Sequence, residues 1–186
     1  MSVPRFGIEP DIELRALEST GVPALEALGD GYTSHRDEWL FSPGSARDFI
    51  ETALSANERC GRLTLGIFEH GILAGVLMCN VDSEQKSVSF DYMLGNRYRG
   101  RGLVTRSVCR LIQHFFERRE FVEAWISVDP GNVKSCAVAV RLGFSVVETV
   151  RGAITSGSEL GDIARYRLTS SEWTPPLNAL PVYKAV

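Results

Sequence analysis

The chain has 186 residues, of which 44% are hydrophobic, and a formal net charge of −3 at pH 7. This length suits a single domain, and the composition is ordinary for a globular protein, so general disorder and a fibrous repeat are excluded. The mild acidity argues against a general nucleic-acid binder, because such domains are usually strongly basic. The chain has 17 glycines, slightly more than the usual proportion of about 7% would give, which points to tight turns.

Membrane, secretory and zinc-binding classes are also excluded. No stretch approaches the roughly 18 apolar residues that span a membrane, and the first ten residues lack the apolar core of a secretory signal. The cysteines and histidines do not fall at zinc-ligand spacings. They are Cys60, Cys79, Cys109, Cys136, His35, His70 and His114. We therefore expect a cytoplasmic protein with reduced thiols that uses no metal and binds neither membranes nor nucleic acid.

The first half of the chain predicts a strand, two helices and a pair of strands. Residues 12–17 alternate between apolar and polar side chains, which is typical of a strand. Ser19 and Thr20 offer a cap for a first helix, and Ser45 offers a cap for a second. The next two strands are expected at residues 63–69 and 72–81, joined by a tight turn at His70-Gly71.

The second half alternates between strands and helices. A strand is expected at residues 87–94, and apolar residues recur on one helical face from Val104 to Phe115, after Gly102. The remaining expected elements are a mostly apolar strand at 121–128, a helix at 132–142 ended by Gly143, and a final hairpin of strands at 144–150 and 163–168.

This order predicts a single α/β domain with a mixed sheet over residues 1–186, with short tails at 1–10 and 175–186. The early strands can pair antiparallel through short turns. The strand–helix–strand unit at 87–128 requires a parallel pair with a crossover helix.

A loop with two closely spaced glycines joins the strand at 87–94 to the following helix. Gly100 and Gly102 let the backbone turn tightly, and the helix N-terminus adds free N–H donors with partial positive charge. Residues 97–119 also contain seven arginines and one acid, so a basic patch suited to several phosphates is expected there. The loop is neither the dinucleotide fingerprint nor a P-loop, and a glycine turn among solvated arginines is the alternative.

A second motif lies at the start of the helix at 132–142. Asn132 and Ser135 are three residues apart and so project from one side of that helix. The helix starts at the C-terminal end of the strand beside the glycine strand, the edge where ligands bind open α/β sheets. Taken alone, Asn132 is a helix cap and Ser135 a solvent-facing residue.

Together, the two motifs resemble those of the GNAT superfamily of N-acetyltransferases. The loop is similar to the family pattern Q/R-x-x-G-x-G/A, and the segments around residues 13–17, 91–94 and 166 are most like the ribosomal-protein N-acetyltransferase branch, RimJ and RimL. The likeness extends from about residue 12 to residue 173. It is carried by Arg97-x-x-Gly100-x-Gly102, Asn132-x-x-Ser135, Leu142-Gly143-Phe144 and Tyr166.

The resemblance implies an enzyme that binds acetyl-coenzyme A where two parallel central strands, at 87–94 and 121–128, splay apart. The backbone of the first strand would pair with the pantetheine arm, the backbone amides of residues 99–103 would hold the pyrophosphate, and Asn132 would bond the arm. The implied cofactor-binding residues are Tyr92, Met93, Leu94, Arg97, Arg99, Gly100, Arg101, Gly102, Leu103, Val104 and Asn132.

The resemblance also implies direct acetyl transfer to a primary amine. Because such amines have a pKa of roughly 8 to 10, they are mostly protonated at neutral pH, and a base or water chain must remove a proton. Ser135 is implied as the acid for the leaving thiolate, and the Met93 N–H as an oxyanion donor. Asp91 is our candidate base. Where the branch often has a glutamate this chain has Ile154, and Ala139 replaces the tyrosine that other branches use as acid.

Several alternatives stay open from the sequence. Glu159 and Asp162 are further carboxylates near the implied site, and acceptors would bind across Trp39, Phe41 and the turn at 153–161. The acceptor is either a protein N-terminal α-amine or a small-molecule amine such as an antibiotic. A coenzyme A-binding module without catalysis and an unrelated nucleotide-binding domain are the rival functions. A homodimer is left open.

Overall fold

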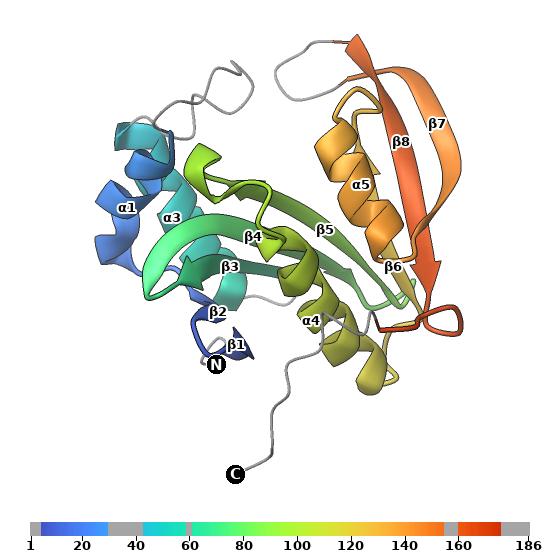
Figure 1. Cartoon of the computed structure of the whole chain (residues 1–186), viewed down its shortest axis with the longest axis horizontal. Helices are drawn as coiled ribbons and strands as arrows, with labels where there is room; N and C mark the ends of the chain where they lie inside the picture. Colours follow the sequence, from blue (N-terminus) through green and yellow to red (C-terminus); the bar gives the residue numbers. More distant parts are fainter. Residues whose placement is uncertain (1–4, 30–42, 59–60, 155–159, 176–186) are drawn as a thin grey trace.

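A computed structural model of the chain describes residues 5–29, 43–58, 61–154 and 160–175. Its strands are β1 (Phe6–Glu9), β2 (Ile12–Ala16), β3 (Arg62–Glu69), β4 (Ile72–Asp82), β5 (Ser87–Leu94), β6 (Glu123–Val128), β7 (Ser145–Ile154) and β8 (Leu160–Thr169). They form one eight-stranded sheet in the order β1-β2-β3-β4-β5-β6-β8-β7, which Figure 1 shows. Among the strands of the described residues, only β5 and β6 pair in parallel. The expected mixed α/β class is confirmed.

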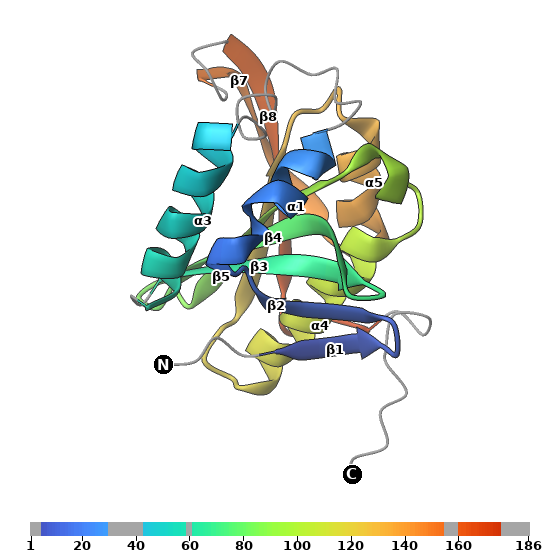
Figure 2. The ribbon, with the colours of Figure 1, turned by 90° about the vertical axis from the view of Figure 1, so that its left-hand side faces the viewer.

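Helices cover both faces of this sheet. They are α1 (Val22–Glu26), α3 (Pro43–Glu58), α4 (Leu103–Glu117) and α5 (Val133–Arg141). Figure 2 shows α3 on one face and α4 with α5 on the other. The Phe90 ring of β5 lies 6.4 Å from that of Phe115 in α4. Because successive side chains of a strand alternate, Asp91 points to the α3 face. No helix in the described part of the chain is long and apolar enough to cross a membrane.

The turns expected from local sequence are confirmed. His70 and Gly71 have φ angles of 51° and 77°, as the two-residue turn between β3 and β4 requires. Gly143 has a φ angle of 85° just after α5, as a helix C-cap does.

Some element boundaries differ from the expectation. The first helix is a short α1 between two 3-10 turns, Ser19–Gly21 and Ala27–Gly29. Helix α3 begins at Pro43, so Ser45 lies in its first turn rather than at its cap. Strands β7 and β8 run longer than predicted because their pairing continues past Gly152, to Ile154 opposite Leu160.

The expected tail at residues 1–10 is wrong for its second half. Phe6–Glu9 forms β1, which pairs antiparallel with β2, and the side chains of Phe6 and Ile8 are buried. Only two apolar residues alternate in this segment, so its sequence carries little strand signal, and pairing with β2 decides its structure.

The parallel strands β5 and β6 separate as the sequence resemblance implied. Their ladder ends at Ser89 opposite Trp125, although β5 continues to Leu94 and β6 to Val128. Backbone groups at the ends of both strands therefore face a widening gap between them. At the same level, Gly75 of β4 lies opposite Leu94, and a Cβ atom at Gly75 would lie 2.3 Å from the Met93 carbonyl oxygen.

Gly75→Ala is therefore expected to lower the free energy of unfolding by about 1–3 kcal/mol, because the added methyl must displace backbone rather than a flexible side chain. Chemical denaturation measures this change. Gly44→Ala is the matched control, since a Cβ there meets nothing within 4 Å and alanine is the better helix former. A Gly75→Ala protein within about 0.5 kcal/mol of the parent would contradict the close approach.

Candidate active site

A cavity of about 1060 Å³ opens between α3 and the separated ends of β5 and β6. It is lined from α3, from β3 to β6, and from the start of α5. Five residues that the sequence analysis selected lie on its wall: Asp91, Tyr92, Met93, Asn132 and Ser135. The structure thus brings the strand and helix parts of the predicted site together.

Asp91 has an environment that favours its neutral form. Its Oδ2 accepts a hydrogen bond from Asn80 Nδ2 at 3.3 Å, and its side chain reaches solvent through the cavity. Partial burial raises the pKa of Asp91, and this effect outweighs the opposite influence of Arg62 and of the Asn80 hydrogen bond. A carboxylate with a raised pKa is a stronger proton acceptor than an exposed aspartate.

Two further carboxylates, Asp48 and Asp129, line the same cavity. Asp129 Oδ1 accepts from the Gly131 N–H at 2.8 Å and so shapes the turn after β6. The sequence analysis missed Asp48, which comes from α3 and lies four residues before Thr52 on the same wall. This four-residue helical spacing was the available sequence signal. Only the packing of α3 on the sheet shows that this face of the helix lines the cavity.

Of the other acids considered from the sequence, Asp162 is not among the described residues that line this cavity. Asp162 Oδ1 accepts from the Gly152 N–H at 3.2 Å, a structural contact across the β7–β8 hairpin. Trp39, Phe41 and Glu159 lie outside the described residues, as does the Ile154 side chain. Within the described residues, no group of three His, Cys, Asp or Glu side chains could hold a metal ion.

The start of α5 is tied to β5 across the splay. Asn132 Oδ1 accepts from the Ser135 backbone N–H at 3.1 Å, which confirms Asn132 as the helix cap. The Tyr92 hydroxyl donates to the Ser135 carbonyl oxygen at 3.4 Å, and burial raises the pKa of Tyr92 to about 12. Ser135 is therefore held at a fixed place on the cavity wall by both neighbours.

The glycine loop has the geometry of an anion site. Gly100 and Gly102 have φ angles of 77° and 74°, and a Cβ atom at either would meet nothing within 4 Å. No backbone partner is found, among the described residues, for the amides of Gly100, Gly102 or Leu103. The Arg99 amide was expected to join them, but it donates to the Asn96 carbonyl oxygen at 3.2 Å. Leu103 and Val104 have buried side chains, so only their backbone can contact a ligand.

The arginine patch is smaller than the sequence suggested. Arg101 pairs with Glu69 at 2.8 Å, and Arg106 pairs with Glu9 at 3.1 Å. Arg118 and Arg119 follow the far end of α4, whose 15 residues span about 22 Å. The sequence showed the positive charges but not the acidic residues that the fold places beside them.

Comparison with known proteins agrees with this geometry. Residues 11–145 match the acetyltransferase (GNAT) domain family. The chain is 26% identical over 174 residues to the putative ribosomal N-acetyltransferase YdaF of Bacillus subtilis (strain 168), covering 89% of this chain and 95% of that protein. The match disfavours an unrelated nucleotide-binding domain.

Solved structures share the same fold. RimL, a ribosomal L7/L12 α-N-protein acetyltransferase in complex with coenzyme A, aligns with a TM-score of 0.80 at 22% identity, over 89% of this chain and 98% of that one. The microcin C7 self-immunity acetyltransferase MccE, in complex with acetyl-CoA and AMP, aligns with a TM-score of 0.79 at 22% identity, over 87% and 94%. The chain therefore belongs to the GNAT acetyltransferase family, as an N-acetyltransferase similar to the RimJ and RimL branch.

Proposed function

We propose that this enzyme acetylates the α-amine at the N-terminus of a protein, using acetyl-coenzyme A, in the cavity between α3 and the β5–β6 splay. The observation that carries the proposal is that Asp91 and Ser135 line one cavity from the two sides of the splay. Three carboxylates, with Asp91 among them, and one guanidinium, that of Arg62, line this cavity, which suits a cationic amine. The names of YdaF and RimL support a protein acceptor.

The residues present fit acetyl-coenzyme A. The loop amides of Gly100, Arg101 and Gly102 would hold the pyrophosphate, aided by the N-terminus of α4 and by the nearby Arg97 and Arg99 side chains. Backbone groups of residues 92–94 would bond the pantetheine arm as an added strand, because β6 no longer pairs there. The Asn132 Oδ1 caps α5, so its Nδ2 group is the donor left for the arm.

When bound, acetyl-coenzyme A supplies the thioester whose acetyl group passes to the amine. Asp91 accepts the proton that the ammonium group must lose before it can attack. The Met93 N–H would be the donor for the thioester carbonyl oxygen, and the Ser135 hydroxyl would be the donor for the departing sulfur.

Ser135→Ala is expected to lower kcat about tenfold and to leave the affinity for coenzyme A unchanged. The loss is modest because a thiolate with a pKa of about 8.5 leaves readily without full protonation. Ser127→Ala is the control, since Ser127 lies on β6 in the same cavity. Steady-state kinetics on both variants measures the difference. A Ser135→Ala enzyme with the parent kcat would remove the acid role.

Peptides distinguish the proposed acceptor from a small-molecule amine. Mass spectrometry should find acetyl groups on the N-terminal α-amine of unblocked peptides, and none on the same peptides with a blocked N-terminus and a free lysine. Acetylation of small amines in preference to every peptide would overturn the protein acceptor. The cytoplasmic location, the homodimer and the lack of a metal requirement stay predictions.

A further inference from the structure

The side chain of Arg101 points away from its own loop. Its Nη1 atom lies 2.8 Å from Glu69 Oε2, at the end of β3. Glu69 is only 8% exposed, whereas the Arg101 side chain is 50% exposed. A nearly buried carboxylate without a cation would be strongly unfavourable, so this pair fixes Arg101 in one direction. Although Arg101 lies in the glycine loop, its charge is therefore engaged by protein rather than free for phosphate.

Arg106, in the first turns of α4, holds the same loop from a second side. Its Nη2 group donates to the Arg101 carbonyl oxygen at 3.0 Å, and its Nη1 lies 3.1 Å from Glu9 Oε1. Arg101 is thus held at its guanidinium by Glu69 and at its carbonyl by Arg106. We call the four residues Glu9, Glu69, Arg101 and Arg106 the loop brace.

The two acids of the loop brace lie on strands that both pair with β2. Glu9 ends β1 and Glu69 ends β3, just before the turns that lead into β2 and β4. Ile12 lies opposite Glu69 in the sheet, and the His70 N–H donates to the Asp11 carbonyl oxygen at 2.7 Å. Neither acid lines the cavity between β5 and β6. Their effect on activity must therefore pass through the loop.

Glycines on both sides of Arg101 explain why such a brace is needed. Gly100 and Gly102 have positive φ angles, and glycine loses more conformational freedom on ordering than any other residue. A loop that must present converging N–H groups binds an anion more tightly when it is already ordered. The brace supplies that order at the one loop position between the two glycines.

We propose that Glu69 and Arg106 are positioning residues that hold the glycine loop in the conformation that binds the coenzyme A pyrophosphate. This inference rests on the proposed cofactor site. It predicts an effect on the binding of one part of coenzyme A, because the loop brace acts on the pyrophosphate end and not on the pantetheine end. S-acetylpantetheine, which carries the thioester but no pyrophosphate, is therefore the diagnostic substrate.

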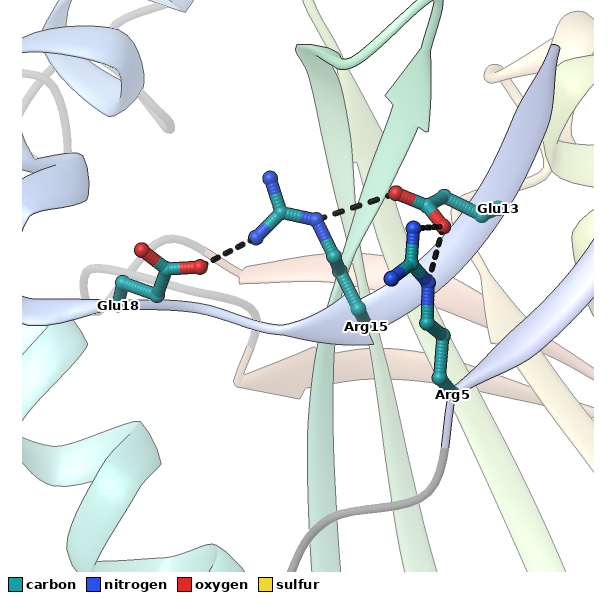
Figure 3. A network of polar contacts seen from close by, with 4 residues as sticks. All are labelled: Arg5, Glu13, Arg15 and Glu18. Carbon is teal, nitrogen blue, oxygen red and sulfur yellow. Dashed lines mark hydrogen bonds and ion pairs between the residues drawn. The ribbon is translucent and has the colours of Figure 1, made fainter.

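Glu13→Gln is a matched control for Glu69→Gln. Glu13 lies on β2 opposite Phe68, next to Glu69 in the sheet. Its carboxylate contacts Arg5 and Arg15, which belong to a separate surface network in Figure 3. The two substitutions remove the same charge from neighbouring places, but only one of the acids contacts the loop.

The experiment compares acetyl-coenzyme A with S-acetylpantetheine in the full chain. Glu69→Gln should raise KM for acetyl-coenzyme A and Kd for coenzyme A about tenfold, or about 1.4 kcal/mol. Its kcat should stay within about twofold of the parent. Its kcat/KM for S-acetylpantetheine should match the parent, and Glu13→Gln should match the parent with both thioesters.

Equal losses with both thioesters, or none with acetyl-coenzyme A, would overturn the inference. If Glu69→Gln does not fold, Arg106→Gln decides by the same two comparisons. A parent enzyme that does not bind coenzyme A would instead overturn the proposed cofactor site. If the parent and the brace variants prefer acetyl-coenzyme A over S-acetylpantetheine by the same factor, the result would contradict the role of the loop brace but not the cofactor site.

Discussion

Asp91→Asn is expected to lower kcat about 1000-fold while leaving the affinity for coenzyme A unchanged. Asparagine has nearly the same shape and can still accept the Asn80 hydrogen bond, but it cannot take a proton from the amine. Steady-state kinetics at saturating acceptor measures the loss. Asp48→Asn is the control, because Asp48 lines the same cavity on α3 and has no assigned role in proton transfer. An Asp91→Asn enzyme that keeps a tenth of the parent rate would remove Asp91 as the base.

The pKa of Asp91 gives this variant a second signature. Burial raises that pKa above its ordinary value of 3.8, so the folded state binds a proton more tightly than the unfolded state. The contribution of Asp91 to stability is therefore fully present below pH 3.8 and is lost as the pH rises through the raised pKa. Relative to the parent, Asp91→Asn should gain stability across that window, and it should be no less stable at pH 7. Thermal unfolding at several pH values checks the sign.

The pH dependence of wild-type activity should also report the ionisation of Asp91. The rate should rise with pH as Asp91 loses its proton, and this limb of the profile should be missing from the residual activity of Asp91→Asn. A profile with an identical acid limb in both proteins would assign that limb to another group.

Gly102→Val is expected to raise the Kd for coenzyme A at least about 100-fold, or about 2.7 kcal/mol. Gly102 has a φ angle of 74° directly before α4, a conformation that a β-branched residue adopts only under strain. The valine side chain would also enter the open space beside the loop amides, where the pyrophosphate is expected. Both effects act on the anion site. Calorimetric titration with coenzyme A measures the loss without needing an acceptor.

Gly152→Val controls for backbone strain. Gly152 has a φ angle of 60°, and a Cβ atom there also meets nothing within 4 Å. It lies in β7, away from α4 and its loop. The control should lose stability like Gly102→Val but keep the parent Kd. A Gly102→Val protein that also keeps the parent Kd would show that the loop does not hold the cofactor.

Features set by neighbouring residues could be predicted from the sequence. The His70-Gly71 turn, the Asn132 cap and the position of the glycine loop each depend on a few consecutive residues, and the structure confirms them. Strand β1 could not be predicted, because Phe6 and Ile8 form a strand only through pairing with β2. Its burial depends on residues that the local pattern does not contain.

In the candidate site, too, some features depend on neighbouring residues and others depend on the fold. Asp91 and Ser135 could be selected from a motif, but their shared cavity depends on the separation of β5 from β6. The charge of Arg101 was counted in the basic patch because a sequence shows a charge without its partner. Glu69, which pairs with it, lies in another strand, and only the fold places the two together.

Acetyl transfer in the β5–β6 splay is tested most directly by following coenzyme A release and peptide acetylation together, in the parent and in Asp91→Asn. The predicted result is one acetylated α-amine for each thiol released by the parent, and almost none by the variant, with equal coenzyme A binding in both. Acetylation at the same rate by both proteins, or coenzyme A binding without any acetylated amine, would contradict it.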